Sequence, residues 1–337
     1  MNAGRGALPN RIPGDGEGMV GKVILIGGSL GAMPPLRMLV AALPSSLAAP
    51  IVIVRHIGAH RSALPEILES LGPLPAKHAE DGEKLVAGTI YVAPSDRHLL
   101  VTPAAKLQLT HGPKENFARP AIDPLFRSAA LALGPAAIGV LLSGRFDDGV
   151  AGLQAVKAAG GTVVVQDPAT AEEPDMPQSA LRHVAVDHIA APDGLAGILV
   201  SLLERALGPR RPAPPDACME HEASNGGPGS IERLESIGRL SPFTCPDCGG
   251  SLWRISGAEP ARYRCHTGHA YSSMVLENGQ RESFEHALRS AMRALQQRER
   301  LLLERASDSP RGGVLVEAAA RCASLAEKLR IVAEERL

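Results

Sequence analysis

Aromatic side chains are scarce in this sequence of 337 residues. Phe, Trp and Tyr contribute 3% of the chain, whereas hydrophobic residues in total contribute 45%. Any buried core must therefore consist mainly of Leu, Val, Ile and Ala side chains. A chain of this length is longer than a domain with a single hydrophobic core usually is, so we expect one large domain and a smaller module.

The sequence also lacks an excess of either charge, since its formal net charge is −1. We therefore expect no binding to nucleic acid. No apolar run is long enough to span a bilayer, so direct membrane insertion is not expected. The N-terminus has no apolar signal-peptide core, and residues 1–18 are interpreted as a disordered leader, with Met19 as an alternative start. These absences predict a soluble, cytoplasmic protein.

Cysteine is rare as well, with five residues, three of which cluster between positions 245 and 265. An odd number with such a cluster argues against a disulfide framework and favours a reduced compartment with a metal site. Cys218 and Cys322 are interpreted as incidental thiols.

Residues 19–205 alternate short β-branched runs with helical patterns. Several of the runs are continuously apolar, as strands buried on both faces are. This alternation predicts an α/β fold with a doubly wound, mostly parallel sheet and helices on both faces. The predicted strands are residues 22–28, 49–56, 88–95, 136–144 and 161–167, and the predicted helices are 34–43, 61–71, 123–133 and 148–160. Residues 99–111 are typical of a hairpin.

The second half of the chain differs in composition. Residues 206–240 are rich in Pro, Gly and Ser, which predicts a linker that lets the flanking parts fold separately. A zinc-ribbon-like module is expected at 241–278. Residues 279–337 are expected to form a helical tail. The sequence is compatible with a helical hairpin that packs on itself or on a partner, and with a coiled-coil dimer.

A glycine-rich turn follows the first predicted strand. Gly27-Gly28-Ser29-Leu30-Gly31 fits G-x-S-x-G between a strand and a helix, where a serine nucleophile is exposed near helix N-terminal amides that can hold an oxyanion. Phosphate-binding loops and plain tight turns share this pattern. A nucleotide site is disfavoured because no lysine follows the glycines and His56, rather than an acidic residue, ends the second strand.

Two further polar residues follow predicted strands. His56 ends the second strand, and Asp148 lies just beyond residues 136–144. Because sites form at the carboxyl ends of parallel strands, Ser29, His56 and Asp148 are expected to converge as nucleophile, base and orienting acid. Asp147 competes for the acid role. His98, His183 and His188 compete for the base.

Residues 22–200 resemble the catalytic domain of the chemotaxis protein-glutamate methylesterases of the CheB type. The segments that carry the resemblance, in chain order, are Ile26 to Gly31, Val54 to His56, 88–101, Arg119 to Ser128, Leu142 to Gly149, Gln166-Asp167 and Met176-Pro177. The resemblance implies hydrolysis of glutamate methyl esters on chemoreceptor-type proteins, and the related deamidation of glutamine, through Ser29, His56 and Asp148. It implies no cofactor for catalysis.

The chain departs from this family in five positions. Leu30 and Ala32 differ near the nucleophile, Arg145-Phe146 replaces the usual Met-Gly at the implied oxyanion hole, and Asp175 precedes Met-Pro where Gly is usual. Phe in place of Gly is costly if the backbone needs a positive φ. These changes motivate an alternative function: a catalytically weakened regulatory or scaffold protein that binds a signalling partner through its ribbon and tail.

The segment before residue 22 is too short for the receiver domain that well-known family members carry. Regulation is therefore expected to be constitutive, supplied by a regulator in trans, or exerted by the C-terminal module.

A tetrahedral zinc site is predicted by the C-x2-C…C-x3-H spacing of four residues, Cys245, Cys248, Cys265 and His269. A region this small cannot form a sufficient hydrophobic core, so it needs a bound metal ion to fold. Free thiols are the other interpretation, and a redox C-x2-C is disfavoured because no βαβ context surrounds it. His266 competes with His269 as the fourth ligand. The segment also resembles the cysteine-rich tail of some receiver-less methylesterase homologues.

Overall fold

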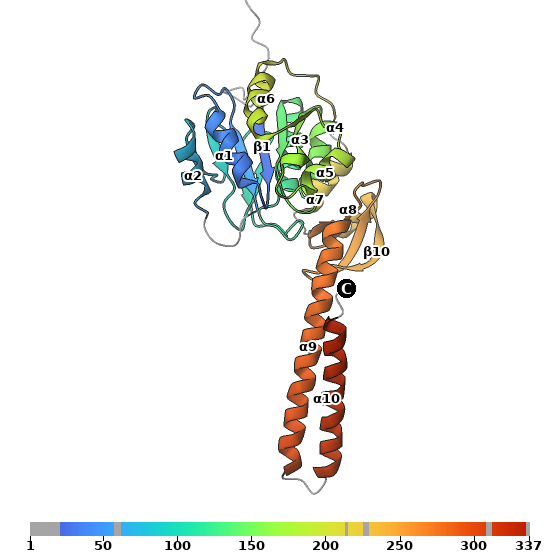
Figure 1. Ribbon diagram of the computed structural model, residues 1–337. Coiled ribbons are helices and arrows are strands. Elements are labelled where there is room, and N and C mark those ends of the chain that lie inside the picture. The colour runs from blue at the N-terminus through green and yellow to red at the C-terminus, as the bar shows by residue number, and fades with distance from the viewer. Residues whose placement is uncertain (1–20, 57–61, 213–214, 225–228, 308–311, 335–337) are drawn as a thin grey trace, which may run out of the picture. The chain divides into compact units, whose positions relative to one another are not determined.

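The structure is a computed structural model that describes residues 21–56, 62–212, 215–224, 229–307 and 312–334 (Figure 1). The predicted disordered leader, residues 1–18, and Met19 lie outside these ranges.

A seven-stranded sheet forms the centre of the first domain, with strand order β3-β4-β2-β1-β7-β8-β9. Every neighbouring pair in it is parallel, so the predicted parallel α/β sheet is confirmed. The strands are β1 (Val23–Gly28), β2 (Ile51–Arg55), β3 (Ala76–His78), β4 (Ile90–Val92), β7 (Ala137–Leu141), β8 (Thr162–Gln166) and β9 (His188–Ala190). The sequence pattern had not indicated the short edge strands β3 and β9.

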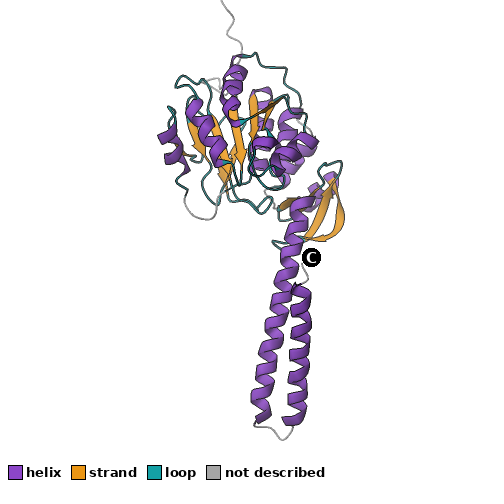
Figure 2. Ribbon diagram, viewed as in Figure 1, coloured by secondary structure: helices purple, strands orange, loops and turns teal. Residues whose placement is uncertain are grey.

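Helices cover both faces of the sheet (Figure 2). One core lies between the sheet and helices α1 (Met33–Ala42), α2 (Leu64–Leu71) and α6 (Pro192–Glu204). The other lies between the sheet and helices α3 (Ile122–Leu133), α4 (Val150–Ala158) and α5 (Asp175–His183). The predicted hairpin is present as antiparallel β5 (His98–Val101) and β6 (Leu107–Thr110), and single 3-10 turns lie at Gly134–Ala136 and Pro168–Thr170.

The strand order determines where a site can form. The chain moves from β1 outward through β2 and β4, then returns to place β7 on the other side of β1. In open α/β sheets, such a reversal leaves a crevice outside the carboxyl ends of the strands. The segments after β1, β2 and β7 meet at this edge.

The predicted linker at 206–240 is not irregular throughout. It contains helices α7 (Pro215–Ala223) and α8 (Ser230–Ile237). Leu234 and Ile237 of α8 pack against Trp253 and Ile255, which gives these helices an apolar partner that the Pro- and Gly-rich composition did not indicate. A four-stranded antiparallel sheet follows, with β10 (Gly238–Thr244), β11 (Ser251–Ile255), β12 (Arg262–Cys265) and β13 (Ala270–Ser272). We call this sheet and its connections the ribbon.

The chain divides into two compact units, Met1–Val275 and Leu276–Leu337. The ribbon belongs to the first unit with the parallel sheet. Helix α9 (Ser273–Ser307) begins earlier than the tail expected at 279, and α10 (Gly312–Glu334) follows the predicted break. None of the described helices combines the length and apolar character needed to cross a membrane.

Candidate functional site

Ser29 occupies a turn that requires small neighbours. It follows β1 and precedes α1, and its amide donates a hydrogen bond to Ser143 O at 2.9 Å. A Cβ on Gly27 would lie 2.3 Å from Ile122 Cγ2, and one on Gly28 would lie 2.6 Å from Ala32 Cβ. Close packing therefore explains both glycines, and the Ser29 side chain is left half-buried at the sheet edge.

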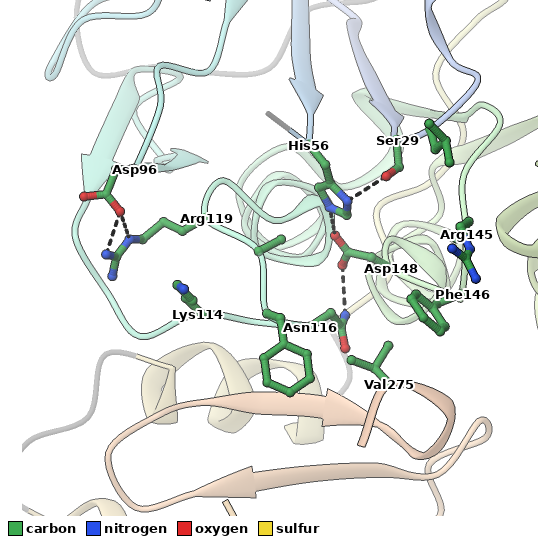
Figure 3. Close-up of a pocket in the computed structure, with 13 residues that line it drawn as sticks. Ser29, His56, Asp96, Lys114, Asn116, Arg119, Arg145, Phe146, Asp148 and Val275 are labelled. Carbon is green, nitrogen blue, oxygen red and sulfur yellow. Dashed lines mark hydrogen bonds and ion pairs between the residues drawn. The ribbon is translucent and has the colours of Figure 1, made fainter. Parts of the chain in front are cut away.

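The structure brings Ser29, His56 and Asp148 together (Figure 3). His56 Nδ1 lies 3.0 Å from Ser29 Oγ, and His56 Nε2 lies 2.7 Å from Asp148 Oδ2. Since a carboxylate only accepts, Nε2 carries the proton and Nδ1 is free to accept from the serine hydroxyl. These three side chains come from the ends of β1, β2 and β7, as the sequence predicted.

Asp148 is buried and held by several donors. The amides of Ile122 and Asp123, at the N-terminus of α3, donate to its two oxygens at 2.7 and 3.2 Å, and the amide of Gly149 donates at 3.0 Å. Burial raises the pKa of Asp148, but the hydrogen bond and charge of His56 and the α3 amides outweigh it and lower this pKa to about 2. Asp148 therefore stays ionised at every pH of practical interest.

Asp147 points to a different partner. Its Oδ1 accepts from Ser272 Oγ of the ribbon at 2.5 Å. Burial, together with the charge of Asp148, raises the pKa of Asp147 to about 6 despite this hydrogen bond. Asp148, and not Asp147, faces the histidine.

The competing histidines have other partners. His98 is buried between Pro113 O, at 2.9 Å from its Nε2, and the amide of Ala121. His183 Nδ1 donates to Ser179 O at 2.9 Å, and His188 lies on edge strand β9. His98 and His183 are therefore bonded to backbone groups, and His56 is the histidine that contacts Ser29.

Phe146 has the backbone conformation that its sequence context suggested. Its φ is +64°, in the region where glycine is favoured. Its amide donates to Asp175 Oδ2 at 3.3 Å. Two departures from the family pattern, Phe146 and Asp175, are thus in direct contact, and a carboxylate engages an amide at the implied oxyanion hole.

A cavity of about 590 Å³ opens over these residues. Its lining includes Ser29, Leu30, His56, Asp96, Lys114, Asn116, Phe117, Ala118, Arg119, Arg145, Phe146, Asp148 and Val275. Arg119 pairs with Asp96 at 2.6 Å. Within the described ranges, Lys114 and Arg145 have no acidic partner, so the cavity offers two cationic groups to an anionic substrate.

Asn116 is a site residue that the sequence pattern did not indicate. Its Nδ2 donates to Asp148 Oδ1 at 3.1 Å and to Asp123 Oδ2 at 3.3 Å. Its φ of +52° is left-handed, which asparagine tolerates better than most residues. No local motif marks such a residue, because its role depends on contacts with distant segments.

The predicted metal ligands also converge. One ligand atom from each of Cys245, Cys248, Cys265 and His269 lies within 4.8 Å of all the others. Zinc–sulfur bonds of about 2.3 Å and zinc–nitrogen bonds of about 2.0 Å predict tetrahedral edges of roughly 3.8 Å between sulfurs and roughly 3.5 Å between sulfur and nitrogen. Cys248 Sγ lies 3.8 Å from Cys265 Sγ, which lies 3.6 Å from His269 Nδ1. The donor set is compatible with a structural metal.

The competing His266 is not among the residues whose ligand atoms converge. It packs against Gly250, where a Cβ would lie 2.9 Å from the His266 ring. His269 instead brings Nδ1 to the three sulfurs.

Comparisons with known proteins agree over the first domain. The sequence pattern of the CheB methylesterase family matches residues 24–199. A relative from Leptospira interrogans is 38% identical over 190 residues, which are 56% of this chain and 98% of that protein. The "Protein-glutamate methylesterase/protein-glutamine glutaminase 3" of Anaeromyxobacter dehalogenans is 40% identical over 187 residues, which are 55% of this chain and 55% of that protein.

A solved structure gives the same result. The CheB methylesterase catalytic domain of Thermotoga maritima is similar with a TM-score of 0.52 and 34% identity, and the match covers 54% of this chain and 98% of that one. These matches concern the α/β domain, since the family pattern ends at residue 199.

Proposed function

Because the chain belongs to the CheB methylesterase family, we propose that it is a cytoplasmic serine esterase that hydrolyses glutamate methyl esters on chemoreceptor-type proteins. The observation that carries the proposal is the continuous hydrogen-bonded chain from Ser29 through His56 to Asp148.

The geometry supports a two-step acyl transfer. His56 Nδ1 takes the Ser29 proton as the hydroxyl oxygen attacks the ester carbonyl, and Asp148 stabilises the imidazolium that forms. The protonated His56 then donates its proton to the leaving methoxide, and methanol departs. Water, activated by the same histidine, cleaves the acyl-enzyme and leaves glutamate. Deamidation of glutamine follows the same steps with ammonia as the leaving group.

The charges that line the cavity support an acidic protein substrate. Lys114 and Arg145 lie at the cavity that holds Ser29. A receptor segment that carries both methylated and free glutamates presents carboxylates beside the reacting ester. Two cations near the nucleophile attract such a segment electrostatically, whereas they do not strengthen the binding of a small neutral ester.

The decisive experiment incubates the full chain with methylated receptor membranes and measures methanol release. Wild type should release methanol and react with a serine-directed fluorophosphonate. Ser29→Ala should do neither, with a loss of roughly 10⁴- to 10⁶-fold in rate, because alanine fits the same turn and only the nucleophile is removed. Full methanol release by Ser29→Ala would overturn the mechanism.

The contact between Asp175 and the Phe146 amide supports the alternative function, a catalytically weakened regulatory or scaffold protein. In that case, Ser29 should resist the fluorophosphonate even in the wild-type chain. Labelling at Ser29 therefore separates the two functions.

We also propose that Cys245, Cys248, Cys265 and His269 hold one structural zinc ion. Four protein ligands close the tetrahedron, so the ion stabilises the ribbon and leaves no position for substrate. The purified chain should contain about one zinc per molecule, and His269→Ala should reduce this content while His266→Ala should not. Equal loss in the two variants would reject the ligand assignment.

A further inference from the structure

The ribbon contacts the wall of the active-site cavity. Residues 114–119, here called the pocket-wall loop, supply five of the lining side chains, Lys114, Asn116, Phe117, Ala118 and Arg119. This loop pairs with ribbon strand β13: the amide of Asn116 donates to Ala270 O at 2.8 Å, and the amide of Ala270 donates to Lys114 O at 3.3 Å. The ring of Phe117 packs on Tyr271, with centroids 5.0 Å apart.

The side chain of Asn116 joins the two sides of this contact. Its Oδ1 accepts from the Ser272 amide of β13 at 3.1 Å. Its Nδ2 donates to Asp148 Oδ1 at 3.1 Å (Figure 3). The same Nδ2 donates to Asp123 Oδ2 at 3.3 Å, so it lies between two buried acidic side chains. One amide group thus connects a ribbon strand to the carboxylate behind His56.

A buried ionic network fixes the same contact. Glu115, on the pocket-wall loop, accepts from Arg264 of β12 at 3.1 Å and from Arg127 of α3 at 2.6 Å. Arg264 also contacts Glu220 of α7 at 3.1 Å, and its side chain is fully buried. Charges buried in this way hold one arrangement, because any shift would leave a charge unpaired.

Strand β13 is also attached to the cysteine cluster. It begins directly after His269, and the Tyr271 hydroxyl lies 2.6 Å from Asp247 Oδ2 and 3.1 Å from Cys245 Sγ. One side of Tyr271 therefore contacts the metal-binding knuckle, while its ring contacts the cavity wall through Phe117.

We propose that Asn116 is a positioning residue for Asp148 and that the metal-bound ribbon holds Asn116 in place, which makes the ribbon part of the esterase active site. The inference rests on the proposed esterase function. It predicts that loss of metal loosens β13, releases the pocket-wall loop and removes one of the donors to Asp148.

Two substitutions test the role of Asn116. Asn116→Gly retains the left-handed backbone and removes the three side-chain hydrogen bonds, to Asp148, Asp123 and Ser272. It should lower kcat for a small ester about tenfold with little change in KM. Asn116→Asp is closer in shape but replaces the donor with a third carboxylate beside Asp148 and Asp123, so it should be slower than the glycine variant. A residue that only fills space would give the opposite order.

Asn278→Asp makes the same chemical change on helix α9 and is the matched control. It should retain the wild-type kcat, since Asn278 contacts Glu282 and Arg281 on its own helix. Wild-type kcat in Asn116→Asp would overturn the positioning role.

Metal removal tests the role of the ribbon. Chelation of the full chain should lower kcat for the small ester about tenfold, and it should speed amide hydrogen exchange in residues 114–123. Chelation of Asn116→Gly should lower kcat by a much smaller factor, because the link is already broken. Quantitative metal removal that changes neither exchange nor kcat would overturn the proposal. If the untreated protein does not hydrolyse the ester at all, the esterase function is rejected instead. Hydrogen exchange would then still show whether the metal-bound ribbon holds residues 114–123 in place.

Discussion

Phe146 shows how single residues distinguish this site from the family pattern. A side chain at φ +64° costs roughly 1–2 kcal/mol, and the surrounding structure must compensate for it. The Phe146 amide is held by Asp175, and Arg145 lies 5.6 Å from the Phe146 ring centroid. Three of the residues that depart from the family pattern therefore contact one another around this backbone position.

Removal of the Asp175 carboxylate should increase turnover. Asp175→Ala frees the Phe146 amide to donate to the developing oxyanion and removes a negative charge beside it. Since one oxyanion donor is worth about 10²- to 10³-fold in kcat, a gain of at least several-fold is expected. Asp193→Ala, in the first turn of α6 as Asp175 is in the first turn of α5, is the control for helix stability. A lower or equal kcat in Asp175→Ala would exclude this amide as an oxyanion donor.

The two neighbouring aspartates should respond differently to the same substitution. Asp148→Asn removes the negative charge that fixes the tautomer of His56 and stabilises its imidazolium, so it should lower kcat by about 10⁴-fold. Asp147→Asn affects only the Ser272 contact and should retain most activity. His56→Gln should be nearly as damaging as Ser29→Ala. An inactive Asp147→Asn beside an active Asp148→Asn would reverse the assignment.

Among the elements of the fold, the contact between the ribbon and the parallel-sheet domain depends on buried charges. Glu115 accepts from both Arg127 and Arg264. Burial raises the pKa of Glu115, but the two arginines overcome this effect and lower it. The network therefore connects α3, the pocket-wall loop and β12 through one carboxylate.

Glu115→Gln should destabilise the chain by about 3–5 kcal/mol, because it leaves two buried arginines short of an anion. Urea denaturation of the full chain measures this loss. Glu285→Gln is the control, since Glu285 pairs with Arg289 on the surface of α9 and should cost less than about 1 kcal/mol. Equal effects would show that the network contributes little.

Local patterns predicted most elements of the first domain and the three residues that meet at its edge. The glycines around Ser29 and the strand ends before His56 and Asp148 are visible in short windows of sequence, because strand periodicity and turn chemistry are local. Helices α7 and α8 and the role of Asn116 were not predictable in this way. They depend on contacts such as Asn116 with Ser272, across 156 residues, which no window contains.

For the molecule as a whole, the buried aspartates predict how stability depends on pH. The pKa of Asp148 is lowered to about 2, so its contribution is present above pH 4 and is lost as the pH falls through 2. The pKa of Asp147 is raised to about 6, so its favourable contribution is present below pH 4 and is lost as the pH rises through 6.

In Asp147→Asn, the free energy of unfolding should therefore change less with pH between pH 4 and 7 than it does in wild type. The variant should gain most in stability relative to wild type above pH 6. Denaturation midpoints of wild type and variant across this range provide the measurement. Parallel profiles would show that Asp147 titrates normally. Asp193→Asn, at the exposed start of α6, is the control for the substitution itself.

The ion pair between Glu115 and Arg264 also constrains how the chain can evolve. The two residues are separated by 149 positions. Within the described residues, replacing Arg264 alone would leave Glu115 paired with Arg127, and replacing Glu115 alone would leave Arg264 paired with Glu220, so either change alone removes one charge from the buried network. A descendant could not discard the ribbon in one genetic step without uncovering Glu115, the carbonyl of Lys114 and the amide of Asn116. Lineages should therefore retain both partners, exchange them together, or pass through an intermediate in which Glu115 has already become neutral.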